Sequence, residues 1–144
     1  MSIAFFAGSF NPFTIGHASV VERALPLFDR IIIGIGSNAE KADEHNNLNA
    51  IREFAKRFNG KVDAVSYNGM LTVDAARHFG ADCLLRGVRS VKDFEYERDL
   101  ADINRRIGAM ETVILFALPD HGAISSSVVR ELASYGRDTS DFLP

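Results

Sequence analysis

Residues 3–17 read Ile-Ala-Phe-Phe-Ala-Gly-Ser-Phe-Asn-Pro-Phe-Thr-Ile-Gly-His. The first five residues form a short apolar run, which is typical of a strand buried on both faces of a sheet. Gly8 ends this run, and Gly16 and His17 stand where a helix is expected to begin. Glycines let a ligand approach the backbone closely, and the free N–H groups of a helix N-terminus attract phosphate. The stretch therefore predicts a buried strand, a phosphate-binding turn and a helix, in that order.

The same alternation continues along the chain. Further short apolar runs, each predicted to be a strand, occupy residues 30–36, 62–67, 82–85 and 112–117. Helical patterns lie between and after them, at residues 18–28, 47–58, 71–79, 92–107 and 126–135. Strands that alternate with helices predict an α/β fold, here a single Rossmann-like, doubly wound domain over residues 1–144 with a five-stranded parallel sheet. Ligands of such sheets bind beyond the carboxyl ends of the strands.

Local signals refine this prediction. Pro26 is expected to end or kink the first helix. Residues 41–49 are the most polar stretch, and we expect them to form a loop. The helix at residues 92–107 carries an apolar stripe that includes Tyr96, which predicts that this side chain packs against the core.

The composition excludes several classes of protein. The chain has 144 residues, of which 47% are hydrophobic and 24% charged, so it is not expected to be disordered. A net charge of −3 disfavours nucleic-acid binding and requires any phosphate site to draw on local positive charge. Cys83 is the single cysteine, which we expect to be a small buried side chain, and the four histidines lack the spacing of metal ligands. The N-terminus is not typical of a signal peptide and no run is long enough to span a membrane, so we expect a cytoplasmic protein.

The turn after the first strand resembles a known signature. Residues 8–17 are similar to the pattern G-[ST]-F-[DN]-P-x-[HT]-x-G-H of the nucleotidyltransferase superfamily, and they match neither a Walker loop nor a Gly-x-Gly-x-x-Gly loop. Asn11 is commoner in the nicotinate-mononucleotide adenylyltransferases of this superfamily, whereas Thr14 resembles the phosphopantetheine branch. This motif therefore indicates the superfamily and leaves the substrate open.

A second motif distinguishes the two branches. Arg86 and Arg89 stand at the end of the fourth predicted strand, where guanidinium groups can clamp phosphate oxygens. The run from Arg86 to Glu97, Arg-Gly-Val-Arg-Ser-Val-Lys-Asp-Phe-Glu-Tyr-Glu, resembles the signature of the phosphopantetheine adenylyltransferase family. Nicotinate-mononucleotide adenylyltransferases remain the alternative, together with a non-catalytic nucleotide sensor.

A third motif follows the last predicted strand. Ser125, Ser126 and Ser127 open the final helix, where serines either cap the helix or bind phosphate. We expect Ser125 to cap the helix and the other two to reach a triphosphate. The run Ile-Ser-Ser-Ser at residues 124–127 also resembles the family's third motif.

The resemblance implies a reaction and a set of site residues. The family joins ATP, carried with Mg²⁺, to 4′-phosphopantetheine, and it implies a homo-oligomer, a hexamer. Catalysis would fall to His17, Lys41 and Arg89. ATP would be bound by Gly8, Ser9, Phe10, His17, Gly87, Arg89, Tyr96, Glu97, Ser126 and Ser127. The acceptor would be bound by Ser9, Lys41, Met70, Leu71, Arg86, Asn104 and Glu131.

Overall fold

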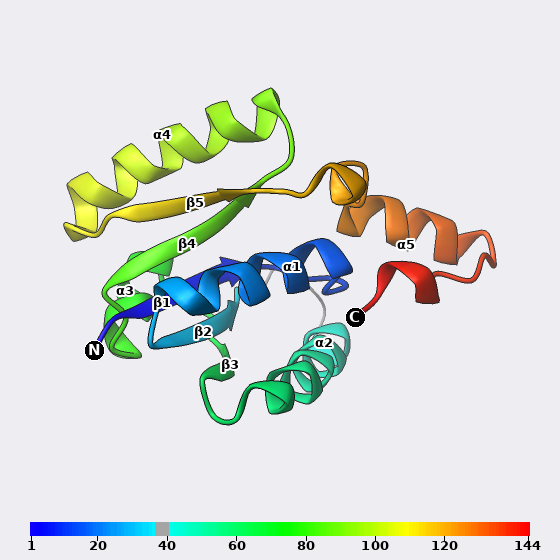
Figure 1. Ribbon diagram of the computed structural model, residues 1–144, viewed down its shortest axis with the longest axis horizontal. Coiled ribbons are helices and arrows are strands. Elements are labelled where there is room, and N and C mark those ends of the chain that lie inside the picture. Colours follow the sequence, from blue (N-terminus) through cyan, green and yellow to red (C-terminus); the bar gives the residue numbers. More distant parts are fainter. Residues whose placement is uncertain (37–40) are drawn as a thin grey trace.

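The computed structural model describes residues 1–36 and 41–144, and the side chains of residues 1–36 and 45–144 (Figure 1). The described residues contain five strands in one parallel sheet, with the order β3-β2-β1-β4-β5. The α/β fold and the five-stranded parallel sheet predicted from the sequence are confirmed. The strands are β1 (Ile3–Gly8), β2 (Arg30–Ile35), β3 (Val62–Ser66), β4 (Cys83–Val88) and β5 (Thr112–Phe116).

Helices cover both faces of this sheet. Helices α1 (Ile15–Ala24) and α2 (Lys41–Ala55) pack on one face, and α3 (Thr72–His78) and α4 (Val91–Gly108) pack on the other. Helix α5 (Ser126–Ser134) stands beyond the carboxyl ends of the strands, as Figure 1 shows. Short 3-10 turns occupy Leu25–Leu27, Lys56–Phe58, Pro119–His121 and Ser140–Phe142. No helix of the described chain combines the length and the apolar character that crossing a membrane would require.

The period of two along β1 divides the core between the two faces. Ala4 and Phe6 belong to the cluster under α1 and α2, while Phe5 and Ala7 belong to the cluster under α3. All four side chains are buried, which explains why the run is apolar throughout.

Several boundaries differ from the sequence prediction. Helix α1 begins at Ile15 and ends at Ala24, because Thr14 caps its first turn and Pro26 cannot continue it. Residues 41–49 were predicted to form a loop, but they belong to α2, and among its residues with described side chains the buried ones, including Ile51, lie in its second half. A polar sequence does not prevent a helix here, since burial of one later face is enough to hold it. This prediction was therefore wrong.

Two further expectations need correction. Strand β4 extends to Val88, because its pairing with β5 continues through Arg86, so this arginine lies within the strand and not beyond it. Cys83 is only half-buried and not fully inside, because it begins β4 at the margin of the core. Burial and the neighbouring Asp82 raise the pKa of its thiol, which leaves it a poor nucleophile.

The strand order fixes where a ligand can bind. From β1 the chain moves outward to β2 and β3, and it then returns to place β4 on the other side of β1. Such a reversal opens a crevice at the carboxyl ends of the two central strands. The turn after β1 and the arginines at the end of β4 are the two segments that border this crevice.

Candidate active site

Two adjoining cavities lie at the carboxyl ends of β1 and β4. The first has a volume of about 350 Å³ and is enclosed by the turn after β1, the end of β4 and the start of α5. The second, of about 580 Å³, lies between the turn after β3 and helix α4. Both are large enough for a small ligand. Three residues, Gly8, Ser9 and Arg86, line both cavities, so the two spaces meet at the end of β1.

His17 is held in place by the cap of its own helix. Thr14 is the N-cap of α1, and its side chain accepts a hydrogen bond from the backbone N–H of His17. In return, the backbone N–H of Thr14 donates to Nδ1 of His17 across 2.9 Å. This is a capping box in which an imidazole takes the place usually held by a glutamate or glutamine. Because Nδ1 accepts a hydrogen bond, the proton of the neutral ring lies on Nε2.

The surroundings of His17 keep its ring uncharged. The ring stacks on Phe13 with centroids 5.4 Å apart and meets the edge-on ring of Phe10 at 4.9 Å. Burial, together with the positive charges of Arg86 and Arg89, lowers the pKa of His17 to about 4. His17 is therefore a neutral hydrogen-bond donor at pH 7, and it faces the first cavity. Phe10 is itself buried, so its contribution is to place this ring.

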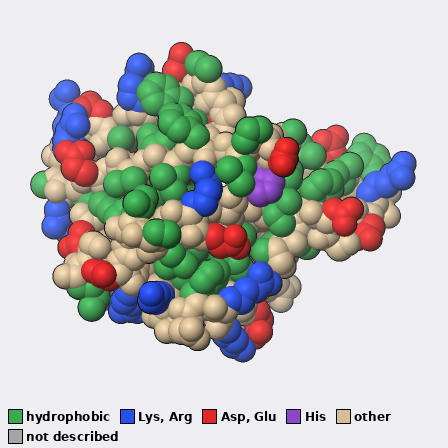
Figure 2. All heavy atoms as spheres, in the orientation of Figure 1, with side chains coloured by type: hydrophobic (Ala, Val, Ile, Leu, Met, Phe, Trp, Pro, Cys, Tyr) green, Lys and Arg blue, Asp and Glu red, His purple; other side chains and the backbone are tan. Residues whose placement is uncertain are grey.

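The first cavity is lined by donors and positive charge. Arg86, Arg89 and Arg130 contribute guanidinium groups, and no Asp or Glu is found among the described residues that line it. Arg130 also donates to the backbone carbonyl of Asn11. On the face shown in Figure 2, by contrast, acidic and basic side chains are interspersed. A phosphate site in a chain of net charge −3 needs local positive charge, and the arginines of this cavity supply it.

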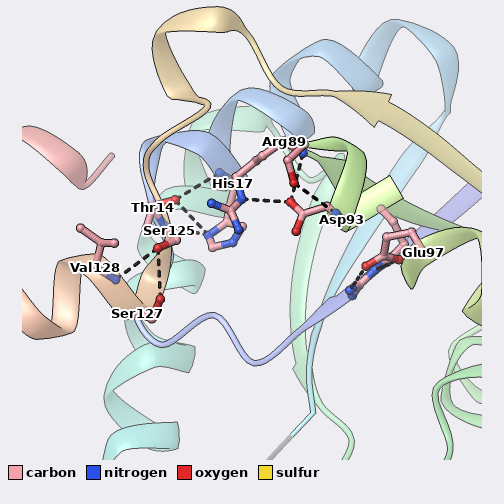
Figure 3. Close-up of polar contacts among 10 residues, drawn as sticks. Thr14, His17, Arg89, Asp93, Glu97, Ser125, Ser127 and Val128 are labelled. Carbon is pink, nitrogen blue, oxygen red and sulfur yellow. Dashed lines mark hydrogen bonds and ion pairs between the residues drawn. The ribbon is translucent and has the colours of Figure 1, made fainter. Parts of the chain in front are cut away.

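The three serines at the start of α5 make different contacts. Ser125 caps the helix, because its Oγ accepts a hydrogen bond from the backbone N–H of Val128 across 3.2 Å. Ser127 Oγ lies 3.2 Å from Ser125 Oγ, and Ser126 Oγ donates to the carbonyl of Pro12. All three serines line the first cavity, and Figure 3 shows Ser125 and Ser127 on the side opposite Arg89. The capping role expected for Ser125 is confirmed.

The second cavity has a different character. Its walls include Met70 and Leu71, from the turn after β3, and the apolar stripe of α4. The stripe was expected to pack in the core, yet Tyr96 is 60% exposed and Ile107 is 58% exposed. Its side chains border an open cavity, and α4 contacts the rest of the fold at β4 and α3. Asn104 adds a polar group to this wall.

The comparison with known proteins decides the family. Residues 5–132 match the model of the cytidylyltransferase-like family. A protein of Porphyromonas gingivalis named phosphopantetheine adenylyltransferase is 50% identical, over 99% of this chain and 94% of that protein. A protein of the same name from Bacteroides thetaiotaomicron is 47% identical, over 100% of this chain and 96% of that protein. The chain belongs to the phosphopantetheine adenylyltransferase family.

A solved structure supports the fold of this family member. The bifunctional NMN adenylyltransferase/ADP ribose pyrophosphatase of Francisella tularensis superposes with a TM-score of 0.69 at 16% identity. The match covers 99% of this chain and 44% of that one. At this level of identity the likeness concerns the fold alone.

Most of the residues that the family motifs indicated come together at the two cavities. Those that line the first are Gly8, Ser9, Phe10, His17, Arg86, Gly87, Arg89, Ser126 and Ser127. Those that line the second are Gly8, Ser9, Met70, Leu71, Arg86, Tyr96, Glu97 and Asn104. Tyr96 and Glu97, which were expected to bind ATP, thus lie beside the residues expected to bind the acceptor. Glu131 is exposed on α5 outside both cavities, and the side chain of Lys41 lies outside the described residues.

Three residues of the site were not singled out from the sequence. Thr14 was read only as a mark of the family branch, although its place three residues before His17 is the spacing of a capping box. Asp93 contacts Arg89 at 3.3 Å. His121 lines the first cavity, and its Nδ1 is buried without a hydrogen-bond partner among the described residues. An unpaired buried ring nitrogen is unusual, since buried polar groups are as a rule hydrogen-bonded.

Asn11, which is commoner in the nicotinate-mononucleotide branch, has a structural contact in this protein. Its Oδ1 accepts a hydrogen bond from Nδ2 of Asn47 on α2 across 3.1 Å. Asn11 lines neither cavity, so its amide ties the turn to a neighbouring helix. The residue that favoured the nicotinate-mononucleotide branch is thus a structural one.

Proposed function

We propose that the chain transfers the adenylyl group of ATP to 4′-phosphopantetheine and forms 3′-dephospho-coenzyme A and pyrophosphate. The observation that carries this proposal is the junction of two unlike cavities at Gly8, Ser9 and Arg86. One cavity is rich in donors and positive charge, while the other is bordered by an exposed apolar stripe. A reaction between a nucleotide and a long, weakly polar acceptor needs such a pair of sites, with the reacting phosphates at the junction.

ATP fits the first cavity. Its phosphates would meet the N-terminus of α1, the start of α5 and the side chains of His17, Arg89, Ser126 and Ser127. The acceptor fits the second cavity, with its pantetheine arm along Met70, Leu71 and Asn104 and its phosphate at Arg86. Lys41 is proposed to bridge the phosphates of both substrates, and Glu131 to contact the acceptor.

The chemistry requires little beyond position and charge. An oxygen of the acceptor phosphate attacks the α-phosphorus of ATP, and the bond from that phosphorus to the β-phosphate oxygen breaks, which releases pyrophosphate. A phosphate dianion is already a nucleophile, so no side chain needs to remove a proton. His17 Nε2–H and Arg89 would stabilise the negative charge that spreads over the phosphate oxygens.

Mg²⁺ would arrive with ATP as part of the substrate. The described residues that line the first cavity supply cations, hydroxyls and imidazole but no carboxylate. No cluster of three or more potential metal-ligating His, Cys, Asp or Glu side chains occurs in the described part of the chain. An ion that bridges the ATP phosphates and keeps its waters fits this setting.

The proposal also covers the oligomeric state and the location of the protein. The half-exposed apolar residues of α4, including Ile103 and Ile107, support assembly into a homo-oligomer, for which we propose the family's hexamer. We also propose a cytoplasmic location, where ATP and the acceptor are both available.

The deciding experiment is pyrophosphate release from Mg²⁺-ATP with 4′-phosphopantetheine or nicotinate mononucleotide offered separately. Release with 4′-phosphopantetheine alone is expected. Release with nicotinate mononucleotide alone would overturn the proposed acceptor. Release with neither, from folded protein that binds ATP in calorimetry, would make the chain a nucleotide sensor.

A further inference from the structure

Two carboxylates on α4 each contact one arginine of the site. Glu97 binds Arg86 through two hydrogen bonds, Nε to Oε2 at 2.8 Å and Nη2 to Oε1 at 2.6 Å. Asp93, one helical turn earlier, receives the backbone N–H of Arg89 at 3.2 Å and lies 3.3 Å from Nε of the same residue. Figure 3 shows Asp93 beside Arg89, with Glu97 further along the same helix. A spacing of four residues puts both carboxylates on the same face of α4.

The position of two carboxylates beside a proposed phosphate site requires an explanation. Each one cancels positive charge that would attract phosphate, so their presence weakens the field of the site. Glu97 is also 5% exposed, and both of its oxygens accept hydrogen bonds from Arg86. A buried carboxylate whose two oxygens both accept from one guanidinium is suited to holding that group in place.

The hydrogen bonds of Arg86 leave part of its guanidinium available. Of the five N–H bonds of an arginine, Nε–H and one on Nη2 point to Glu97, and one on Nη1 points to the carbonyl of Ala7 at the end of β1. One N–H on each terminal nitrogen therefore remains for a ligand, as far as the described residues show. The hydrogen bonds and charge of Glu97 outweigh the effect of burial and raise the pKa of Arg86, which keeps it a cation.

We propose that Glu97 and Asp93 are positioning residues, which fix Arg86 and Arg89 in the orientation that receives the substrate phosphates. This inference rests on the proposed function and deepens it. An arginine that is already fixed loses less side-chain entropy when a phosphate binds. Asp93 is itself fixed, because its backbone N–H donates to Oγ of the helix cap Ser90 across 3.1 Å. Two of the three acidic residues of the run from Arg86 to Glu97 thus serve its two arginines, and the third, Glu95, does not.

The proposal predicts a distinct kinetic effect for Glu97→Gln. Glutamine keeps the size of the side chain but removes the charge and one of the two acceptors. We expect KM for 4′-phosphopantetheine to rise roughly 10- to 100-fold, because a charged hydrogen-bonded pair is lost beside the acceptor cavity. KM for ATP and the preference for ATP over GTP should hold. If Glu97 instead contacts adenine, KM for ATP rises and the preference for ATP falls, and the proposal fails.

Two further variants provide a control and an independent test. Glu95→Gln removes an exposed carboxylate of the same helix that lines neither cavity, and both KM values should stay at wild-type level. Asp93→Asn tests the more exposed ion pair, between Asp93 and Arg89. This variant remains informative even if Glu97→Gln does not fold. We expect it to raise KM for ATP by about two- to fivefold, because half-exposed ion pairs are weak. An unchanged KM for ATP in Asp93→Asn would remove Asp93 from the proposal.

A direct measurement does not depend on turnover. The Nε–H signal of Arg86 in a ¹H–¹⁵N NMR spectrum should be slow to exchange with water in the wild type, and it should exchange rapidly or disappear in Glu97→Gln. Persistence of the signal would overturn the positioning role of Glu97. A wild type that releases no pyrophosphate with any acceptor contradicts the proposed function alone, since this spectrum still reports on the pair.

Discussion

The backbone N–H of Thr14 donates to Nδ1 of His17 across 2.9 Å, so the residue that caps helix α1 also sets the tautomer of its histidine. The consequence is chemical. With Nδ1 occupied, only Nε2 carries a proton, and the ring acts toward the first cavity as a donor without charge. The arrangement is local in sequence, because the cap residue and the histidine are three residues apart.

The first prediction concerns the titration of His17. Its pKa is lowered to about 4, so the folded protein stays neutral at this ring while an unfolded chain takes up a proton below about pH 6.5. Stability is therefore expected to fall as pH falls from 6.5 to 4, by about 3 kcal/mol from this group. NMR of the ring protons should give a midpoint near 4 for the signal that is absent in His17→Phe. A midpoint near 6.5 would contradict the neutral donor.

The second prediction separates the packing of His17 from its chemistry. Phenylalanine fills the space between Phe10 and Phe13 but has no N–H to offer, so His17→Phe should fold. Its kcat should fall roughly 10²- to 10³-fold, the usual loss when one donor to a developing negative charge is removed. The assay is pyrophosphate release at saturating substrates, with thermal denaturation as the check on folding. A turnover number equal to that of the wild type would remove His17 from the mechanism.

The sequence was informative where one local rule decides the structure. Short apolar runs such as residues 3–7 predict strands, since only a strand buried on both faces needs every side chain to be apolar. The turn after the first strand and the arginines at the end of the fourth were both assigned to carboxyl ends of strands, and parallel strands carry these ends to one edge of the sheet. In the structure, Gly8 from the end of β1 and Arg86 from β4 line both cavities.

It was less informative where tertiary packing decides. The stripe that contains Tyr96 has the period of a core helix, but its face borders a cavity, and periodicity alone cannot distinguish these environments. The partner of Glu97 lies eleven residues away on another element, so no local pattern reveals the pair. Residues 41–49 look like a loop because their polarity reflects exposure, which a helix end shares with a loop.

The third prediction tests the close contact between β1 and β2. A Cβ at Gly34 would lie 2.8 and 2.9 Å from two carbons of the Phe5 ring and closer still to a third, and this ring is fully buried. Gly34→Ala should therefore cost about 1–3 kcal/mol in free energy of unfolding, measured by denaturant titration. Gly122→Ala is the matched control, because its backbone is helical and the nearest atom would lie 3.6 Å away. Equal stabilities of the two variants would show that the ring moves aside without cost.

The fourth prediction concerns Asn11, the residue that pointed to a different acceptor. Its amide faces Asn47 and neither cavity, and an aspartate at this place could accept the same hydrogen bond from Nδ2 of Asn47. Asn11→Asp should leave KM for 4′-phosphopantetheine within about twofold and should confer no activity with nicotinate mononucleotide. Asn11→Leu, which removes the acceptor, should lower the melting temperature while the choice of acceptor stays the same. Activity with nicotinate mononucleotide that changes with the residue at position 11 would mean that this amide does select the substrate, through a route other than direct contact with the cavities.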